Sequence, residues 1–409
     1  MNERVILPGV RSGTVTVPPS KSEAHRLLIA ALLSGRPLPE IEDGLSEDIQ
    51  ATAECLRALR SEKETADLFC RESGSTLRFL LPVAGALRKT AVFHREGRLP
   101  ERPLEPLLSE LKAHGMTFEE NGALLFVSGR LSGGRFTLPG DVSSQFVSGL
   151  LFALPILPES SELLVTGRIE SEAYIEMTLE TIRKAGVSVR VTETPEGRRY
   201  EVPGRQNYRL PETLAPGGDW SGASFFFAMG ALSETGVTVE GLSADSPQGD
   251  KAMLSVLERF GAEVKIRDGR VTVSKGRLKG CSVDAAMIPD LVPPIAVVAA
   301  LSEGETVIGN AGRLRIKESD RLKTTASLIN ALGGKAEEME DGLRIYGVGK
   351  LKGGRVTSAS DHRIAMSAAA AAAGSEQEII IEDPDVVRKS FPGFYEELEK
   401  LSRSEGRDQ

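Results

Sequence analysis

Residues 257–276 read LERFGAEVKIRDGRVTVSKG and predict one complete supersecondary unit. The stretch begins inside an amphipathic helical pattern that stops at Gly261. Two short strand-like runs follow, joined by a tight turn and closed by Gly276, which is the pattern of a β-hairpin. A glycine at a helix end can adopt the left-handed conformation that turns the chain into a strand. We therefore expect a helix, a left-handed Gly261 and a hairpin, in that order.

The same plan occurs in three other parts of the chain, at residues 107–129, 179–204 and 328–349. The helix-ending glycines there are Gly115, Gly186 and Gly333, and with Gly261 they are spaced 71, 75 and 72 residues apart. A unit of about 70 residues fits into the chain about six times, which predicts two domains of three units each. Coincidental helix and hairpin segments in a generic α/β enzyme are the alternative. The nearly constant spacing of four copies argues against it.

The composition restricts the class of protein. A chain of 409 residues, 40% of them hydrophobic, can bury a large core and is long enough for two domains. Charged residues make up 26% and the net charge is -8, which argues against a nucleic-acid or membrane-surface binder. An acidic protein that binds small anions must gather its Lys and Arg residues in one place.

Cysteine usage and the N-terminus predict the compartment. Cys55, Cys70 and Cys281 are odd in number, far apart and without metal-ligand spacing, so we expect neither a disulfide framework nor a metal site. The first residues, MNERVILPGV, lack the apolar core of a signal peptide, and no segment is apolar enough to span a bilayer. The sequence predicts a soluble cytoplasmic protein.

Five segments place polar residues directly before an apolar or small-residue helix. They begin at SKSEAHR (20–26), ESGSTLR (72–78), GDVSSQF (140–146), GDWSGA (218–223) and SDHRIA (360–365). Ser, Asp or Thr stands at each expected N-cap, and a helix that is apolar all round is a buried one. An ordinary N-cap with solvated charges explains any single segment. If the N-termini converge, however, their dipoles and cations would form a site for anions.

Charged residues stand at these boundaries along the chain: Lys21, Arg26, Arg78, Arg102, Asp290, Lys317, Glu318, Asp320, Arg321, Asp361, His362, Arg363 and Lys389. One segment alone, such as RIKESDR (315–321), would be a solvated helix face with ion pairs. The ordered set resembles the 5-enolpyruvylshikimate-3-phosphate (EPSP) synthase family nearly end to end. The motifs that carry the resemblance are SKSEAHR, ESGSTLR, ERP, SSQF, SEAYIEMTL, GDWSGASFF, QGDKAML, IPD, RIKESDR, DHRIAM and KSFPGF.

The resemblance implies an α/β (α+β) fold with two domains, each built from three βαβαββ units as an inside-out α/β barrel. This agrees with the repeat count. The chain of this family crosses between domains twice, here near PPSK and LAPGGDW. We expect one domain of residues 1–19 plus 217–409 and an inserted domain of residues 20–216. Closure of such domains around small anions would expel water and strengthen the charge contacts inside.

The resemblance also implies an activity. The family transfers the enolpyruvyl group of phosphoenolpyruvate to the 5-hydroxyl of shikimate 3-phosphate and releases phosphate, in the synthesis of chorismate and aromatic amino acids. The two substrates bring about five or six negative charges, which would explain the many cations. We expect these two small molecules as the partners, no cofactor, and a monomer.

The family's binding residues carry over motif by motif, as expectations. Phosphoenolpyruvate would be held by Lys21, Gly74, Arg102, Gln145, Arg321, Arg363 and Lys389. Shikimate 3-phosphate would be held by Lys21, Ser22, Arg26, Ser143, Ser144, Gln145, Ser171, Tyr174, Asp290 and Lys317. Arg suits phosphate and carboxylate because its planar fork donates two parallel hydrogen bonds.

The reaction adds a hydroxyl to C2 of the enol while C3 is protonated, and then expels phosphate while C3 loses a proton. A proton donor and a proton acceptor are both needed. The candidates are Asp290 and Glu318, with Lys21 or Lys389 assisting, and the sequence leaves their division of labour open.

The chain departs from many relatives at several of these motifs. Glu72 stands where many have Asn, His25 replaces a common Asn, and Arg313 stands where some have Asn. Gly74 keeps the small residue against which the family's inhibitor glyphosate packs, while Phe79 replaces a Pro of some members. The sequence therefore leaves glyphosate sensitivity open.

Three other classes of protein are disfavoured by the sequence. The enolpyruvyl transferase that acts on UDP-N-acetylglucosamine shares the fold, but it typically has a cysteine in the loop that reads HREGRLPERP here. A non-catalytic anion-binding relative would be expected to lose Asp290, Glu318 or Lys389, and all three are present. A P-loop or Rossmann enzyme is disfavoured because neither glycine motif occurs.

Overall fold

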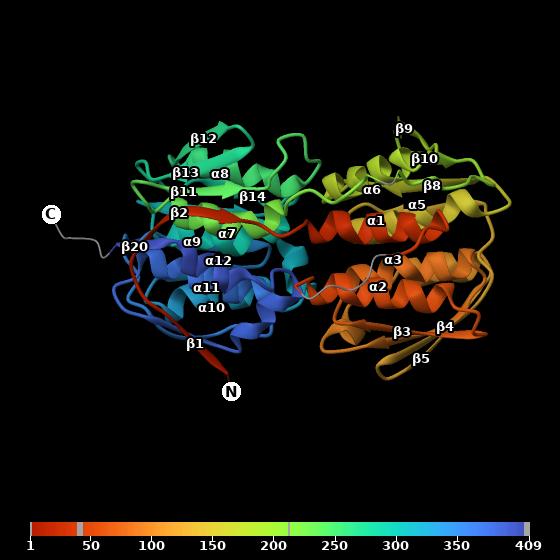
Figure 1. Cartoon of the computed structure of the whole chain (residues 1–409), viewed down its shortest axis with the longest axis horizontal. Helices are drawn as coiled ribbons and strands as arrows, with labels where there is room; N and C mark the ends of the chain where they lie inside the picture. Colours follow the sequence, from red (N-terminus) through yellow and green to blue (C-terminus); the bar gives the residue numbers. More distant parts are fainter. Residues whose placement is uncertain (1, 39–43, 212, 405–409) are drawn as a thin grey trace. The chain divides into compact units, whose positions relative to one another are not determined.

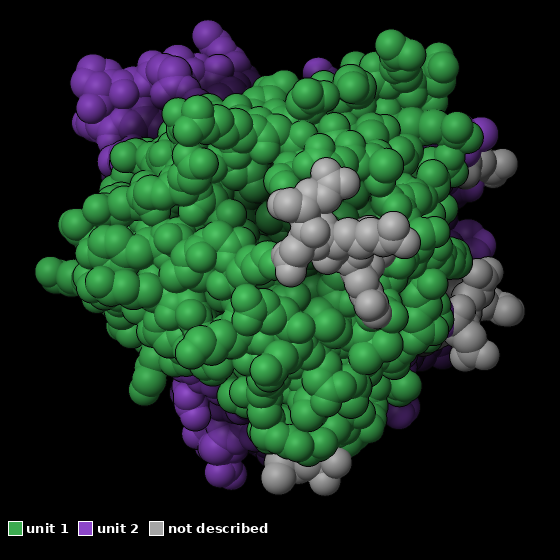
Figure 2. Space-filling view, turned by 90° about the vertical axis from the view of Figure 1, so that its left-hand side faces the viewer, with its two compact units in different colours: residues 1–20, 217–409 green, residues 21–216 purple. Residues whose placement is uncertain are grey.

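The computed structural model describes residues 2–38, 44–211 and 213–404. The chain forms two compact units, shown in different colours in Figure 2. Unit 1 consists of Met1–Ser20 and Gly217–Gln409, and unit 2 consists of Lys21–Pro216. In each unit, helices lie between layers of strands (Figure 1).

Unit 1 contains strands from both ends of the chain. Its strands are β1 (Glu3–Ile6), β2 (Val10–Thr16), β11 (Val237–Glu240), β12 (Glu263–Arg267), β13 (Arg270–Ser274), β14 (Ser282–Asp284), β15 (Glu305–Gly309), β16 (Lys335–Met339), β17 (Gly342–Tyr346), β18 (Gly354–Thr357), β19 (Ile379–Glu382) and β20 (Ser402–Ser404). Its helices are α7 (Trp220–Gly230), α8 (Met253–Phe260), α9 (Val292–Ala300), α10 (Arg321–Ala331), α11 (His362–Ala371) and α12 (Phe394–Lys400).

Unit 2 is formed by one continuous stretch of chain. Its strands are β3 (Thr65–Arg71), β4 (Thr90–Arg95), β5 (Met116–Asn121), β6 (Leu124–Gly129), β7 (Arg135–Pro139), β8 (Ser161–Thr166), β9 (Arg190–Thr194) and β10 (Gly197–Val202). Its helices are α1 (Lys21–Leu33), α2 (Glu47–Arg60), α3 (Gly74–Ala86), α4 (Leu107–Ala113), α5 (Ser144–Ala153) and α6 (Glu172–Lys184).

The predicted repeat is present as one sheet plan used four times. In each copy two parallel strands are followed by an antiparallel hairpin, giving the orders β3-β4-β6-β5, β7-β8-β10-β9, β14-β15-β17-β16 and β2-β11-β13-β12. The four helix-ending glycines all have the predicted left-handed backbone, with φ of 96° at Gly115, 77° at Gly186, 101° at Gly261 and 83° at Gly333. The sequence pattern therefore identified the repeating unit and its turning point correctly.

The other two copies differ from this plan. In unit 1, β18 pairs parallel to β19, and the N-terminal strand β1 pairs antiparallel to β19 and completes a three-stranded sheet. In unit 2, the remaining copy is represented in the described residues by α1 and α2, and residues 39–43 between them lie outside that part. The sheets are small and mixed, and none closes into a barrel in the part of the chain that the structure describes.

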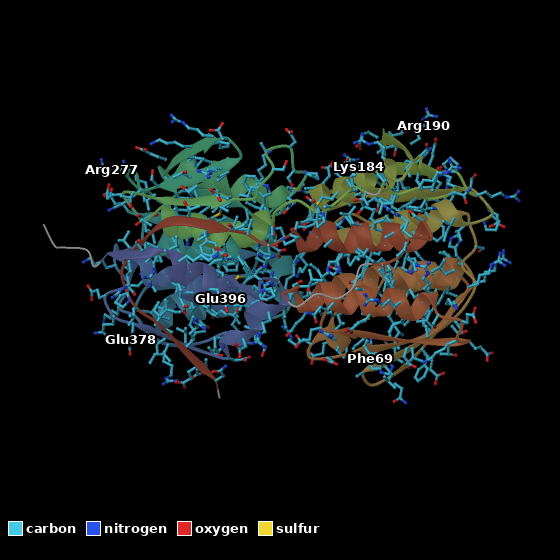
Figure 3. The ribbon with its side chains drawn as sticks, in the orientation of Figure 1. Phe69, Lys184, Arg190, Arg277, Glu378 and Glu396 are labelled. Carbon is cyan, nitrogen blue, oxygen red and sulfur yellow. The ribbon has the colours of Figure 1, made fainter. Side chains whose placement is uncertain are left out.

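The core helices are buried on all sides, as their composition predicts. Every residue of α9 and α11 is buried, and in α7 only Ser221 is partly exposed. The outer strand β9 faces solvent instead, because all its residues except the last are exposed. Exposed charged residues labelled in Figure 3 are Arg190 in β9, Lys184 at the end of α6 and Glu378 before β19. No helix in the described ranges is both long and apolar enough to cross a membrane.

Candidate substrate-binding clusters

Five helices of unit 2 pack in a closed ring in the order α1, α2, α3, α5, α6 and back to α1. Side chains near their starts are hydrogen-bonded from helix to helix. Lys21 in α1 pairs with Asp48 in α2 at 2.8 Å, and Gln145 in α5 donates to Ser75 in α3 at 2.8 Å. Because first turns meet first turns, these helices run parallel and present their N-terminal ends at one face. That face combines several positive dipole ends, which is favourable for an anion.

The caps at this face are the predicted ones. Ser73 caps α3 and accepts from the Thr76 N–H, and Ser143 caps α5 and accepts from the Gln145 N–H. Ser144 is the first residue of α5 and is buried. Ser171 precedes α6 in a left-handed conformation with φ of 55°. Such a conformation costs about 1 kcal/mol or more in a residue other than glycine and concentrates at functional sites.

Arg26 is buried and joins α1 to α6. Its Nε donates to the Thr178 hydroxyl at 2.8 Å, and its two terminal nitrogens donate to the carbonyls of Ser22 and Tyr174 at 2.6 and 2.7 Å. Burial lowers the pKa of Arg26 to about 10, so the group stays charged at neutral pH. Its hydrogen bonds go to neutral oxygens, so this buried charge favours an anion near the starts of α1 and α6.

Gly74 leaves room for the guanidinium of Arg102. A Cβ at position 74 would come within 2.8 Å of an Arg102 terminal nitrogen and 2.9 Å of its Cζ. Arg78, one turn further along α3, donates to the Gln145 side-chain oxygen at 2.8 Å and to the Pro103 carbonyl at 3.0 Å. The start of α3 therefore brings the predicted residues Gly74, Arg102 and Gln145 together.

His25 is part of a buried chain of hydrogen bonds across three helices. Its Nδ1 lies 2.7 Å from the Thr52 hydroxyl, which lies 2.6 Å from that of Thr76. Burial lowers the pKa of His25 to about 3, outweighing the attraction of Asp48. The imidazole is therefore neutral in the folded protein above about pH 3. In the unfolded chain it becomes charged below about pH 6.5.

We expect this histidine to make the protein acid-sensitive. Because the folded pKa is below the unfolded value, the unfolded chain binds the additional proton, and stability is lost as pH falls from about 6.5 towards 3. At pH 5 the loss should be about 2 kcal/mol relative to pH 8. Urea unfolding of the wild type and of His25→Asn at both pH values measures it. Equal pH dependence of the two proteins would contradict this assignment.

Unit 1 gathers the starts of α7, α9, α10 and α11 around Asp290, which lies in the 3-10 turn η4 (Pro289–Leu291). Asp290 contacts three cations: Arg321 at 2.8 Å, Arg363 at 3.1 Å and Lys317 at 3.7 Å. Three cations, each more than 25 residues from Asp290 in sequence, thus meet at one carboxylate. The predicted residues of this unit form one cluster.

Arg321 is the most enclosed member of the cluster and is only 1% exposed. It donates to Asp361 through Nε at 2.7 Å and through a terminal nitrogen at 3.2 Å, and it contacts Glu318 at 2.7 Å. With Asp290 included, three of its five N–H groups donate to carboxylates. Contacts with three carboxylates therefore fix its orientation.

The cluster sets the protonation state of its members. Burial alone would raise the pKa of Asp290, but Arg363, Lys317 and Arg321 outweigh it and hold this pKa well below the usual range. Burial lowers the pKa of Lys317 to about 8 in spite of Asp290. Asp290 is therefore ionised at neutral pH and cannot donate a proton.

Lys389 lies in the 3-10 turn η7 (Pro384–Lys389), which packs on α11. It is buried and donates to the Ser360 carbonyl at 3.1 Å, next to the Asp361 cap of α11. The sequence did not indicate Asp48 as the partner of Lys21, and it indicated Asp361 as an N-cap but not as the partner of Arg321. A carboxylate at a helix start is too common to have marked either one.

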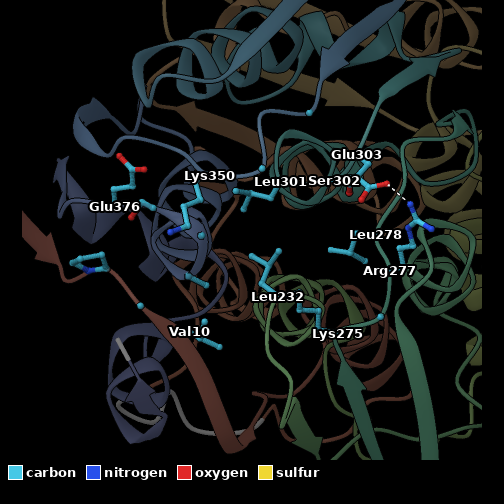
Figure 4. A pocket seen from close by; sticks show the side chains of 18 residues that line it. Val10, Leu232, Lys275, Arg277, Leu278, Leu301, Ser302, Glu303, Lys350 and Glu376 are labelled. Carbon is cyan, nitrogen blue, oxygen red and sulfur yellow. Dashed lines mark hydrogen bonds and ion pairs between the residues drawn. The ribbon is translucent and has the colours of Figure 1, made fainter. Parts of the chain in front are cut away.

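A separate cavity of about 1040 Å³ lies in unit 1 (Figure 4). It is lined by residues beyond the C-terminal ends of the core helices, including Leu232 after α7, Ser302 after α9 and Ser375 after α11, and Arg277 pairs with Glu303 at 3.2 Å there. The cluster around Asp290 involves the opposite ends of these helices. The cavity is therefore distinct from the predicted site.

Comparisons with known proteins agree with this architecture. The enolpyruvyl transferase NikO from Streptomyces tendae superimposes with a TM-score of 0.78 over 98% of this chain and 97% of that one, at 17% identity. The fold is therefore that of the enolpyruvyl transferases. EPSP synthase from Acinetobacter baumannii superimposes with a TM-score of 0.74 over 99% of this chain and 100% of that one, at 25% identity.

The sequence comparisons identify one family among the proteins with this fold. The model described as EPSP synthase (3-phosphoshikimate 1-carboxyvinyltransferase) matches residues 8–398. Proteins named 3-phosphoshikimate 1-carboxyvinyltransferase are 40% identical in Clostridium kluyveri, over 97% of this chain and 96% of the relative, and in Clostridium perfringens strain SM101, over 98% and 99%. The chain belongs to the EPSP synthase family.

Proposed function

We propose that this enzyme transfers the enolpyruvyl group of phosphoenolpyruvate to the 5-hydroxyl of shikimate 3-phosphate and releases phosphate, as a step of aromatic amino acid biosynthesis. The observation that carries the proposal is the cluster of Lys317, Arg321 and Arg363 around Asp290, in a chain of this family. The three cations can bind phosphate and carboxylate groups, and the carboxylate is the proposed proton acceptor.

We propose that each substrate is bound by the residues that the sequence motifs predict for it. Phosphoenolpyruvate would be bound by Lys21, Gly74, Arg102, Gln145, Arg321, Arg363 and Lys389. Ser22, Arg26, Ser143, Ser144, Ser171, Tyr174 and Lys317 would bind shikimate 3-phosphate. The parallel helix starts of unit 2 support the second set, because backbone N–H groups and serine hydroxyls suit phosphate oxygens. Both sets of residues are needed, because the reaction requires the two substrates to be bound at the same time.

The protonation state of Asp290 narrows the proposed chemistry. As a carboxylate, it would accept the proton of the 5-hydroxyl as that oxygen bonds to C2 of phosphoenolpyruvate. A second group must protonate C3, and Lys21, Glu318 and Lys389 are the candidates. In the second half of the reaction the C2–O bond to phosphate breaks, C3 loses a proton, and the enol ether forms. Cations around the phosphate would stabilise the leaving group.

The direct test is phosphate release from phosphoenolpyruvate with two acceptors offered in parallel. We expect turnover with shikimate 3-phosphate and none with UDP-N-acetylglucosamine, and mass spectrometry of the product should show the enolpyruvyl ether. Turnover with the nucleotide sugar alone, or with neither acceptor, would contradict the proposal.

Gly74→Ala should weaken phosphoenolpyruvate binding selectively. The added methyl would meet the Arg102 guanidinium at 2.8 to 3.0 Å, so that side chain must shift. We expect the KM for phosphoenolpyruvate to rise about tenfold, the size of one charged hydrogen bond, with the KM for shikimate 3-phosphate unchanged. Steady-state kinetics measure both constants. Gly393→Ala is the control, because nothing lies within 4 Å of its added Cβ, and equal effects of the two changes would refute the role of Arg102.

We further propose that the enzyme works as a monomer in the cytoplasm. Its three cysteines are free, and Cys55 and Cys70 are buried, which suits a reducing compartment. Light scattering of the purified chain would test the oligomeric state.

A further inference from the structure

Arg198 lies in β10 and joins that strand to α6 and β9. Its Nη1 forms ion pairs with Glu172 and with Glu176, the latter at 3.4 Å, and its Nε donates to Glu193 at 2.5 Å. Glu172 and Glu176 are the first and fifth residues of α6, so they lie on the same face of that helix. The Arg198 side chain is only 16% exposed. One guanidinium therefore contacts three carboxylates near the start of α6.

The start of α6 carries two residues that are predicted to bind shikimate 3-phosphate, Ser171 and Tyr174. Ser171 directly precedes Glu172 and is 2% exposed, and its carbonyl accepts from the Tyr174 N–H at 3.1 Å. The Tyr174 carbonyl in turn accepts from Arg26 of α1 at 2.7 Å. The first turn of α6 is thus held at two points, by Arg26 at its backbone and by Arg198 at the Glu172 side chain.

The negative charge of Glu172 disfavours a phosphate at the neighbouring Ser171. A carboxylate in the first turn interacts favourably with the helix dipole by itself, so Glu172 does not need Arg198 in order to stabilise α6. A phosphate bound at the same helix start is also an anion, however, and the two groups repel each other. Between a carboxylate and a phosphate dianion a few ångströms apart in water, the repulsion corresponds to about tenfold in affinity. An arginine that pairs with the carboxylate offsets this repulsion.

We propose that Arg198 is a positioning residue for shikimate 3-phosphate: it binds the Glu172 carboxylate and so offsets the repulsion of a phosphate at Ser171. The proposal rests on the proposed function, because it needs the start of α6 as part of the shikimate 3-phosphate site. Arg198 acts only through Glu172 and needs no contact with the substrate. Glu176 and Glu193 also contact Arg198, but they lie one turn further along α6 and in β9.

Steady-state kinetics of the full-length enzyme with shikimate 3-phosphate and phosphoenolpyruvate test the proposal. Arg198→Met should raise the KM for shikimate 3-phosphate about tenfold and leave kcat and the KM for phosphoenolpyruvate within about twofold. Adding Glu172→Gln to Arg198→Met should bring the raised KM back to within about threefold of the wild type, because the repelling charge is gone. About 0.5 M KCl should narrow the difference between Arg198→Met and the wild type, since salt screens the repulsion.

Two changes are matched controls. Arg190→Met removes an exposed arginine of β9 that pairs with Glu201 at 3.5 Å, and it should leave all constants unchanged. Adding Glu193→Gln to Arg198→Met removes one carboxylate of the same cluster, but not the one next to Ser171, so it should not restore the KM for shikimate 3-phosphate.

A wild-type KM in Arg198→Met, a raised KM that Glu172→Gln does not restore, or equal rescue by Glu193→Gln would overturn the proposal. If Arg198→Met does not fold, Glu172→Gln alone decides. A KM for shikimate 3-phosphate about threefold below that of the wild type supports the proposal, because one negative charge beside the phosphate is removed, and an unchanged or higher KM overturns it. A wild type inactive with shikimate 3-phosphate would overturn the proposed function instead.

Discussion

Replacing Lys21 by Met is expected to reduce kcat/KM by about 1,000-fold while the protein keeps its fold. Lys21 is the first residue of α1, where the positive end of the helix dipole disfavours a cation. Its position therefore costs helix stability, which the ion pair with Asp48 at 2.8 Å offsets in part. Because a cation at this position does not stabilise the helix, we expect Lys21 to bind a ligand. Initial rates and a thermal melt measure the two parts of this prediction.

Lys63→Met is the matched control for this variant. Lys63 is exposed between α2 and β3, so its loss should change neither rate nor melting temperature. Wild-type activity in Lys21→Met would remove Lys21 from the site. An inactive Lys21→Met protein that is also unfolded would show a structural role and would contradict the argument from the helix dipole.

The second large effect is expected for Asp290→Asn, which keeps the size of the side chain but removes the proton acceptor. We expect kcat to fall about 1,000-fold, within the range for loss of general base catalysis. The surrounding cations keep the pKa of Asp290 well below its usual range, so Asp290 should stay ionised from pH 6 to 9. Its titration should therefore not change the wild-type activity in that interval. The ratio of wild-type to variant kcat should therefore be constant across that interval.

Asp284→Asn is a nearby control. Asp284 is exposed and accepts from the Ala286 N–H at 3.0 Å, and Asn caps such a turn equally well. We expect it to behave as the wild type. A loss in Asp290→Asn that disappears at high pH would contradict the assignment of Asp290 as a carboxylate acceptor, because it would reveal another group acting as the base.

The sequence predicted the features of this fold that are decided locally. The left-handed glycines at 115, 186, 261 and 333 follow from the end of a helical pattern before a hairpin, and each is found. The N-caps Ser73, Ser143, Asp219 and Asp361 follow from a polar residue before an apolar run, and each caps its helix. These features depend on neighbouring residues, so a single sequence contains them.

The pairings inside the clusters depend on contacts between distant parts of the chain. Arg26 bonds to Thr178, 152 residues away, and Arg363 bonds to Ser221, 142 residues away. Neither pattern nor motif indicates which oxygen a buried guanidinium will meet. The contacts of Arg321 with three carboxylates were not predicted, for the same reason.

We propose that the cations named above bind phosphoenolpyruvate and shikimate 3-phosphate. This proposal is tested most directly by a crystal structure of the slow Asp290→Asn variant with shikimate 3-phosphate and phosphoenolpyruvate. The account predicts that Lys21, Arg102 and Arg363 all donate to the same phosphoenolpyruvate molecule, and that Ser143, Ser144 and Ser171 surround the phosphate of shikimate 3-phosphate. Phosphoenolpyruvate bound without Lys21 and Arg102, with both side chains directed to solvent, would contradict it.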